Sequence, residues 1–598
     1  MQQPGGLTRG VRRRRKWILA TTASLVMTLT LGVGLVGLQG WRAKGHLETA
    51  AGLFVRLEQQ IRRADVSAAE GSLSALQVET KAAHDETNGF GWAIGGHLPV
   101  IGDDLGAVRT VSAVLDDLAG NGLPVLLDVA NGLDPAALSP RHGRIDVSEL
   151  TTAAPRISAG LAVIRRAQSR VAGIRTDDLA GQLRTAVQQL SDGLAKAERL
   201  TASANRAAWL LPRMLGANGP RTYLLLFQNN AEIRATGGMP GAYIVIRADA
   251  GAVTIIDQGT AGGDIQVFDP PVVRLDADLE ALYTTRPAVY PADVNLTPDF
   301  PTAARLFRTM YQKRSGIAVD GVMATDPVAL SYLLRVTGAV KMPEGEPLTA
   351  QNAVRVLLSE AYAKYPNPSD QDAYFAGAAR ATFEALIKGQ GNPRGIVTEL
   401  ARAAGERRLL MWNTHQDEQA DIAGTVLEGR LPANDGGSPT VGVFLNDGSG
   451  GKLSYYLTAA ARLSMGKCTG EGGRELHLKF TIGSTAPGAG LPAYVTGLAL
   501  SGDPYTSRTN VMLFSPTGGG VVRITLNGKE VEFGTGLERD RGVGVLTVDL
   551  PPGSSRTYDV TIQSGQLPRA DAAVTPRLWT TPGVRPWKTS VTPGPRCS

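Results

Sequence analysis

The sequence predicts a multidomain protein: a transmembrane helix, an α-helical juxtamembrane region, a three-layer α/β domain and a C-terminal antiparallel β-sandwich. Three observations lead to this prediction. An uncharged apolar stretch follows a basic N-terminus, helical periodicity fills the next part of the chain, and strand-like runs then alternate first with helices and later only with turns. At 598 residues the chain is also too long for one core. The predicted segments are a basic cytoplasmic tail (1–16), a transmembrane helix (17–40), a helical juxtamembrane region (41–215), an α/β domain (220–425), a β-sandwich (436–565) and a Pro-rich tail (566–598).

The apolar stretch WILATTASLVMTLTLGVGLVGLQGW (17–41) holds no charged residue and is long enough as a helix to cross a hydrocarbon core of roughly 30 Å. The basic residues before it place the N-terminus in the cytoplasm and the bulk of the chain outside the cell membrane. A cleaved signal peptide is the alternative. The length of the stretch and the lack of a clear A-x-A site favour an uncleaved signal-anchor.

The charge is confined to the N-terminal tail. Residues 1–16 hold six basic residues and no acidic one, and the whole chain is also formally +6, so the remainder is neutral. A neutral body excludes a nucleic-acid-binding surface, which needs many cationic contacts to phosphate.

The juxtamembrane region is predicted to be helical because apolar residues recur every three or four positions. The first such series is Leu47, Ala51, Phe54, Leu57 and Ile61. Glycines and a proline in GFGWAIGGHLPVIGDDLG (89–106) interrupt the helices.

The α/β domain is predicted from strand runs that alternate with helices. TYLLLF, AYIVI and VTIIDQG read as strands, FPTAARLFRTMYQKRSG (300–316) as a helix, and VDGVMATD (319–326) as a further strand before the helix PVALSYLLRVTG.

Beyond residue 436 the helical patterns stop. Strand runs such as VGVFLND, ELHLKFTIGS and VVRITLNGKEVEF, with an Asn-Gly hairpin signal at 526–530, predict the β-sandwich. The Pro-rich tail is expected to be extended or disordered. The chain holds two cysteines, Cys468 and Cys597. They could form a disulfide with each other, remain as two free thiols, or link the chain to a partner protein.

A polar group interrupts the first two strands of the α/β domain. Glu232 and Arg234 share one face of an extended segment, and Gly237 and Gly238 allow close approach to the backbone. A carboxylate, a guanidinium and free amides suit a phosphate or metal–phosphate group, and a local salt bridge is the alternative. The candidate site residues are Asn229, Asn230, Glu232, Arg234, Gly237, Gly238, Asn295, Asp299 and Asp320.

No common catalytic motif accompanies this group. The six histidines are scattered, and neither a G-x-S-x-G elbow nor a Walker loop is present, although DGSGGK (447–452) approaches the latter. The sequence therefore predicts no nucleophile. Asp299 also suits the simpler role of a helix N-cap.

Several segments carry a family resemblance. FQNNAEIRATGGMPGAY, NLTPDFPTAA, VDGVMATDPVALSYLL, LLMWNTHQDEQ and FLNDGSGGKLSYYL together resemble the bacterial envelope family filed as domain of unknown function 4012. More distantly, TYLLLFQNNAEIRATGG, VTIIDQ and SGIAVDGVMATDPVALSYLLRVTGAVKM are similar to LytR-CpsA-Psr proteins. This second resemblance implies binding and transfer of polyprenyl-pyrophosphate-linked glycan, with Glu232 on a divalent cation such as Mg²⁺ and Arg234 on phosphate. The R-x-x-R-Q segment of that family has no counterpart here beyond Arg380.

The expected function is binding of envelope glycan, peptidoglycan or a polyprenyl-linked intermediate by a membrane-anchored extracytoplasmic protein. Two alternatives stay open: a glycopolymer phosphotransferase, and a structural or partner-binding scaffold. Arginines that converge on one pocket would favour the transferase, and scattered ones the scaffold. The arginines concerned are Arg234, Arg247, Arg274, Arg305 and Arg380.

Overall fold

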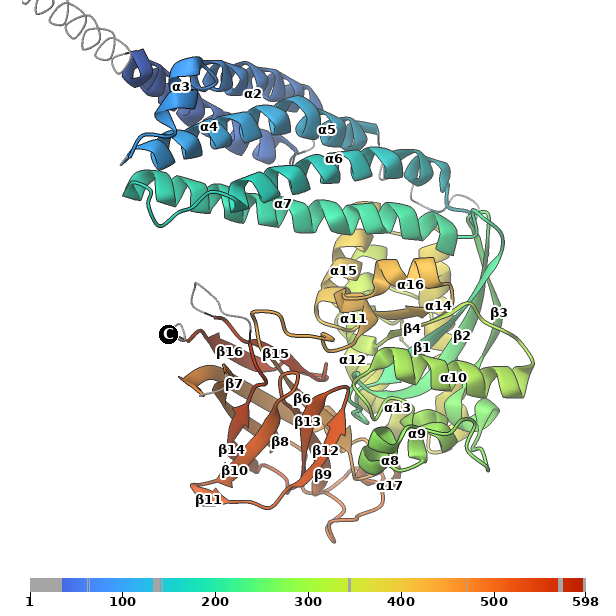
Figure 1. The fold of residues 1–598 in the computed structure, drawn as a ribbon. Helices are drawn as coiled ribbons and strands as arrows, with labels where there is room; N and C mark the ends of the chain where they lie inside the picture. Colours follow the sequence, from blue (N-terminus) through green and yellow to red (C-terminus); the bar gives the residue numbers. More distant parts are fainter. Residues whose placement is uncertain are drawn as a thin grey trace, which may run out of the picture. The chain divides into compact units, whose positions relative to one another are not determined.

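The chain forms two compact units. The first comprises residues 1–134 and 148–211, and the second comprises residues 135–147 and 212–598. The computed structural model (Figure 1) describes residues 35–61, 63, 65–99, 101–132, 140, 143–342, 346–469, 472–567 and 574–594.

The first unit is helical throughout its described regular elements. Apolar stripes at helical spacing form its cores, as in the buried Ile157, Leu161 and Ile164 of one long helix. The helices are residues 35–61, α2 (Val66–Thr87), α3 (Phe90–Gly95), α4 (Gly102–Asp117), α5 (Leu123–Gly132), α6 (Ser148–Ala172) and α7 (Gly181–Met214), with a π-helical turn over Leu118–Gly122.

The prediction of a transmembrane helix needs correction. Most of residues 17–40 lies outside the described residues. Among the helices that the structure describes, none is both long enough and apolar enough to cross a membrane. The helix over residues 35–61 carries Arg42, Lys44 and Glu48, so only its first seven described residues are free of charge. The single-pass signal-anchor prediction is corrected with it.

The α/β domain is built on a five-stranded mixed sheet of order β3-β2-β1-β4-β5. Only β1 and β4 are parallel, and the other neighbours are antiparallel. The strands are β1 (Arg221–Asn229), β2 (Met239–Asp249), β3 (Ala252–Thr260), β4 (Gly321–Thr325) and β5 (Leu410–Asn413).

Helices cover both faces of this sheet. On one face α10 packs Phe307 and Met310 against Leu224 and Leu226 of β1. On the other face α11 contacts β1, and α14 contacts β2 and β3. The helices are α8 (Ala277–Tyr283), α9 (Arg286–Val289), α10 (Phe300–Ser315), α11 (Pro327–Thr337), α12 (Ala353–Arg355), α13 (Ala361–Lys364), α14 (Pro368–Ile387), α15 (Pro393–Gly405) and α16 (Gln416–Ile422).

Two further sheets face each other across a shared core. One has the order β11-β10-β14-β8-β7-β16, and the other has the order β12-β13-β9-β6-β15. Leu478 and Phe480 of the first meet Val443 and Leu513 of the second. The elements are β6 (Thr440–Asp447), β7 (Leu457–Cys468), β8 (Arg474–Ser484), α17 (Ala493–Thr496), β9 (Ser507–Phe514), β10 (Gly520–Leu526), β11 (Lys529–Glu530), β12 (Gly534–Glu538), β13 (Arg541–Leu550), β14 (Ser555–Gln563), β15 (Arg577–Thr580) and β16 (Lys588–Thr592).

The prediction of a purely antiparallel sandwich is wrong, because both sheets are mixed. β15 pairs parallel to β6, and β16 pairs parallel to β7. Both strands come from the Pro-rich tail, whose prolines suggested an extended or disordered segment. The prolines lie between and beside the two strands, where a missing N–H breaks no ladder.

Candidate functional site

The segment between β1 and β2 leaves the sheet and enters the β-sandwich. Residues 230–238 are buried throughout. The Ile233 side chain belongs to the sandwich core, and its carbonyl oxygen accepts a hydrogen bond of 2.8 Å from the Asp447 N–H at the end of β6. The Ala235 N–H donates to Asn446 Oδ1 at 2.9 Å. The connection therefore joins the α/β domain to the sandwich.

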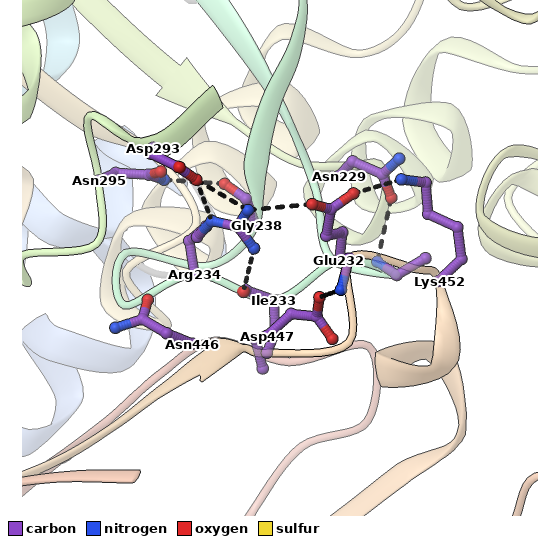
Figure 2. Close-up of polar contacts among 12 residues, drawn as sticks. Asn229, Glu232, Ile233, Arg234, Gly238, Asp293, Asn295, Asn446, Asp447 and Lys452 are labelled. Atoms are coloured by element: carbon purple, nitrogen blue, oxygen red, sulfur yellow. Dashed lines mark hydrogen bonds and ion pairs between the residues drawn. The ribbon is translucent and has the colours of Figure 1, made fainter. Parts of the chain in front are cut away.

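The Glu232 carboxylate lies between two cations (Figure 2). Its Oε1 accepts from Arg234 Nη2 at 3.0 Å, and its Oε2 accepts from Lys452 Nζ. The Lys452 ammonium also lies 5.0 Å from the centre of the Tyr494 ring, within cation–π range. Both carboxylate oxygens are thus engaged by side chains of this chain.

Arg234 links Glu232 to a second carboxylate. Its Nη2 donates to Asp293 Oδ1 at 3.0 Å, and Nε donates to the same oxygen at 3.3 Å. The other Asp293 oxygen accepts from Arg286 Nε at 2.9 Å. The Arg286 side chain is 56% exposed, so the series of ion pairs ends at the surface there. We call Glu232, Arg234, Arg286, Asp293 and Lys452 the charge cluster.

Burial and neighbouring charges set the protonation of this region. Burial alone would raise the pKa of the Glu232 carboxyl, but the charges of Lys452 and Arg234 outweigh it and hold the pKa below its usual value. Asp447 lies close by without such cations in contact. Its burial, followed by the charge of Glu232, raises its pKa to about 6. Asp447 Oδ1 has no hydrogen-bond partner among the described residues.

The amides of the predicted site are also held internally. Asn230 Nδ2 donates to Asp326 Oδ2 at 3.0 Å and to the Pro582 carbonyl oxygen at 3.2 Å. Asn229 Nδ2 donates to the Tyr362 hydroxyl. Asn295 Nδ2 donates to the carbonyl oxygen of Gly238 at 2.8 Å. These amides fix the loop.

The double glycine accommodates the protein's own backbone. A Cβ on Gly238 would lie 2.2 Å from the carbonyl carbon of Asn229, and a Cβ on Gly237, which has φ +140°, would lie 2.7 Å from Gln228 Oε1. The two glycines were predicted to let another group approach the backbone closely. The group that approaches them is the start of the same loop, at Gln228 and Asn229.

The remaining two candidates lie elsewhere. Asp299 caps α10 through the Thr302 N–H at 3.2 Å and pairs with Arg430 at 2.5 Å. Burial alone would raise the Asp299 pKa, but the hydrogen bond and charge of Arg430 lower it. Asp320 accepts from the Thr222 N–H at the start of β1, whereas the charge cluster follows the end of that strand. Seven of the nine predicted residues come together.

Sequence reasoning missed Lys452, Asp293, Arg286 and Asp447. Lys452 and Asp447 end and begin the DGSGGK stretch, which resembled an incomplete phosphate loop. Asp293 lies two residues before Asn295, just outside the NLTPDFPTAA stretch. The types and positions of these residues were visible, but nothing in a single sequence paired them with Glu232 across the roughly 50 to 220 positions that separate them from it.

The charge cluster suits a divalent cation poorly, because Arg234 and Lys452 already occupy the Glu232 oxygens. Within the described residues no group of three or more His, Cys, Asp or Glu side chains is arranged to hold a metal ion. An apolar cavity lies beside β1, lined in part by Phe227, Leu357 and Phe375, and measures about 50 Å³. This is well below the roughly 300 Å³ at which small-molecule pockets begin.

Fold and site define a protein in which an α/β domain and a β-sandwich are joined through a buried network of ion pairs. Residues 218–362, from just before β1 into α13, match the model of the family described as protein of unknown function (DUF4012), and the prediction of this family is thereby confirmed. The fainter resemblance to LytR-CpsA-Psr proteins stays a prediction.

Other comparisons add little. None of the curated proteins matches the chain. One solved structure, described as the transcriptional regulator yvhJ from Bacillus subtilis, is similar at 11% identity over 34% of this chain and 77% of that chain, with a TM-score of 0.21. A TM-score this low supports no conclusion on fold or function.

Proposed function

We propose that this chain is a non-catalytic, extracytoplasmic protein of the bacterial cell envelope that binds glycan. The observation that carries the proposal is the internal pairing of the charge cluster. Each carboxylate oxygen of Glu232 and Asp293 accepts a hydrogen bond from an arginine or lysine of the same chain. A site that holds a metal-bound pyrophosphate needs cations and carboxylates that are available to the ligand. Here every carboxylate oxygen of the pair is already engaged within the chain, and the ion pairs join two domains.

The distribution of arginines supports the same choice. Arg305 donates to Thr302 Oγ1 at 2.9 Å, and Arg380 lies 3.9 Å from Glu384 on its own helix. Arg247 and Arg274 are exposed. None of these four has a contact with the charge cluster, and a transferase would bring several of them to the phosphate.

The size of the apolar cavity favours a glycan over a lipid-linked ligand. A polyprenyl chain needs a long apolar channel, and the cavity beside Phe227 measures about 50 Å³. A glycan chain needs no such channel, because its hydroxyl groups can form hydrogen bonds with polar side chains on an open surface.

The state of Cys468 supports a location outside the cytoplasm. Cys468 is disulfide-bonded. The sequence holds one other cysteine, Cys597, which lies outside the described residues. Structural disulfides persist in oxidising compartments and are rare in the cytosol.

Calorimetric titration of the full chain tests the proposal. The ligands are polyprenyl pyrophosphate, with and without Mg²⁺, and soluble peptidoglycan fragments, added to the natural protein and to Arg234→Lys. The variant keeps the charge but cannot bridge Glu232 and Asp293 as the guanidinium does. We expect glycan binding in both proteins and no Mg²⁺-dependent binding of the pyrophosphate. Mg²⁺-dependent pyrophosphate binding that Arg234→Lys abolishes would instead establish the transferase-type site.

A further inference from the structure

We propose that the outer face of the sheet β10-β14-β8-β7 binds an acidic polysaccharide, a glycan chain that bears phosphate or carboxylate groups. This deepens the proposed function and rests on it, since it names the surface and the ligand class. The face is hollowed (Figure 1 gives the strands), and the hollow measures about 410 Å³. That volume lies within the range of ligand sites, about 300–1,000 Å³.

Strand periodicity places the relevant side chains on this face. Leu463, Leu478, Val560 and Ile524 point into the sandwich core, so the residues that alternate with them point outward. The outward-pointing side chains that line the hollow are all polar or charged: Arg462, Ser464, His477, Lys479, Arg523, Thr525, Asp559 and Thr561.

The first row across the sheet places two like charges side by side. Arg462 of β7 is directly opposite Lys479 of β8, and Lys479 is opposite Asp559 of β14, with which it forms an ion pair of 3.2 Å. Like charges opposite each other on neighbouring strands destabilise a sheet. Arg462 has no ion-pair partner among the described residues, so its position is unfavourable for the fold alone and favourable for binding an anion.

The neighbouring second row across the sheet carries hydroxyl groups, an imidazole and one guanidinium. Ser464 of β7 is opposite His477 of β8, His477 is opposite Thr561 of β14, and Thr561 is opposite Arg523 of β10. Within the part of the chain that the structure describes, Arg523 also lacks an ion-pair partner. Hydroxyl and imidazole groups beside a guanidinium suit the hydroxyls of a sugar next to its anionic group.

The spacing favours a polymer over a single small anion. Arg462 and Arg523 lie on strands that are three intervals apart, about 14 Å at the usual strand spacing. At this backbone separation, a single phosphate ion would reach both guanidiniums only if the two side chains leaned toward each other across β8 and β14. A chain with repeated anionic groups can contact both by crossing the two rows diagonally, over the hydroxyl groups of the second row.

Calorimetric titration of the full chain with three glucose- or uronate-based polymers tests this site. The probes are dextran phosphate, polygalacturonate and neutral dextran, at low and at high salt. The test variant is Arg462→Gln/Arg523→Gln. The matched control is Lys529→Gln/Arg556→Gln, which removes two exposed positive charges of the same sheet that do not line the hollow.

We expect the natural protein to bind at least one of the two charged polymers more tightly than neutral dextran. Tighter binding of dextran phosphate would identify phosphate as the recognised group, and tighter binding of polygalacturonate would identify carboxylate. The test variant should bind it roughly tenfold or more weakly, as expected for the loss of charged hydrogen bonds, and the control should bind as the natural protein does. Unchanged binding by the test variant, or equal loss in the control, would overturn the site while leaving glycan binding in place. If the natural protein binds none of these polymers but binds peptidoglycan fragments, the site is likewise overturned. If it binds neither, the proposed function fails as well.

Discussion

Replacing Arg234 by methionine tests whether the charge cluster stabilises the protein. The change removes the hydrogen bonds of 3.0 Å to Glu232 and Asp293 and one of the two hydrogen bonds to the Ile233 carbonyl oxygen, which keeps the Asp447 N–H. Breaking a buried ion pair by removing one partner costs about 3–5 kcal/mol. Because Glu232 keeps Lys452 and Asp293 keeps Arg286, we expect the lower end of this range.

The assay is urea-induced unfolding of the full chain, followed by circular dichroism. A matched control is Arg156→Met, which breaks an ion pair of 2.7 Å with Asp128 whose side chains are 55% and 65% exposed. Solvent screening limits such a pair to about 1 kcal/mol or less. If Arg234→Met costs no more than the control, the argument that burial makes the charge cluster a stabilising joint is refuted.

Three further predictions concern the same region and the disulfide. Burial and Glu232 raise the pKa of Asp447 from 3.8 to about 6, so the folded protein binds a proton that the unfolded chain releases, and stability falls as the pH rises through this window. Asp447→Asn should therefore be more stable than the natural protein by up to about 3 kcal/mol at pH 8, and equally stable below pH 4. Urea unfolding at both pH values measures this, and a difference that does not depend on pH would contradict it. Gly238→Ala should cost about 1–3 kcal/mol, because its Cβ would lie 2.2 Å from the Asn229 backbone, while Gly241→Ala, with its nearest contact at 3.8 Å, should be tolerated in the same unfolding measurement. Reduction of the Cys468 disulfide should destabilise the second unit by about 2–4 kcal/mol, as measured by scanning calorimetry. Cys468→Ser should lose the same stability and should not respond to reductant. An unchanged melting temperature after reduction would show that the disulfide contributes little to stability.

Local patterns predicted most of the regular elements. The strand-like runs TYLLLF and AYIVI lie in β1 and β2, and the Asn-Gly pair at Asn527 lies in the hairpin between β10 and β11. Each of these depends on neighbours within a few residues, so the sequence carries the information directly.

Local sequence patterns could not predict which distant strands and side chains pair with each other. Nothing local distinguishes KTSVT as a strand that pairs parallel to β7, more than 120 residues earlier. The partner of Glu232 is Lys452, 220 residues away, and the two meet only because the β1–β2 connection inserts Ile233 into the sandwich core. The polar residues between β1 and β2 were correctly grouped, but their partners depend on tertiary structure.

The two parallel edge strands have a consequence for the newly made chain. β6 is buried along its whole length and is completed by β15, which begins about 130 residues later. Ribosomes add about 5–20 residues per second, so β6 and β7 present unpaired backbone for roughly ten seconds before the residues that cover them exist. An open apolar strand edge invites pairing with other chains. Biogenesis of this protein therefore requires that nascent chains stay apart during that interval, and an assisting holdase would act on the segment from β6 to β14.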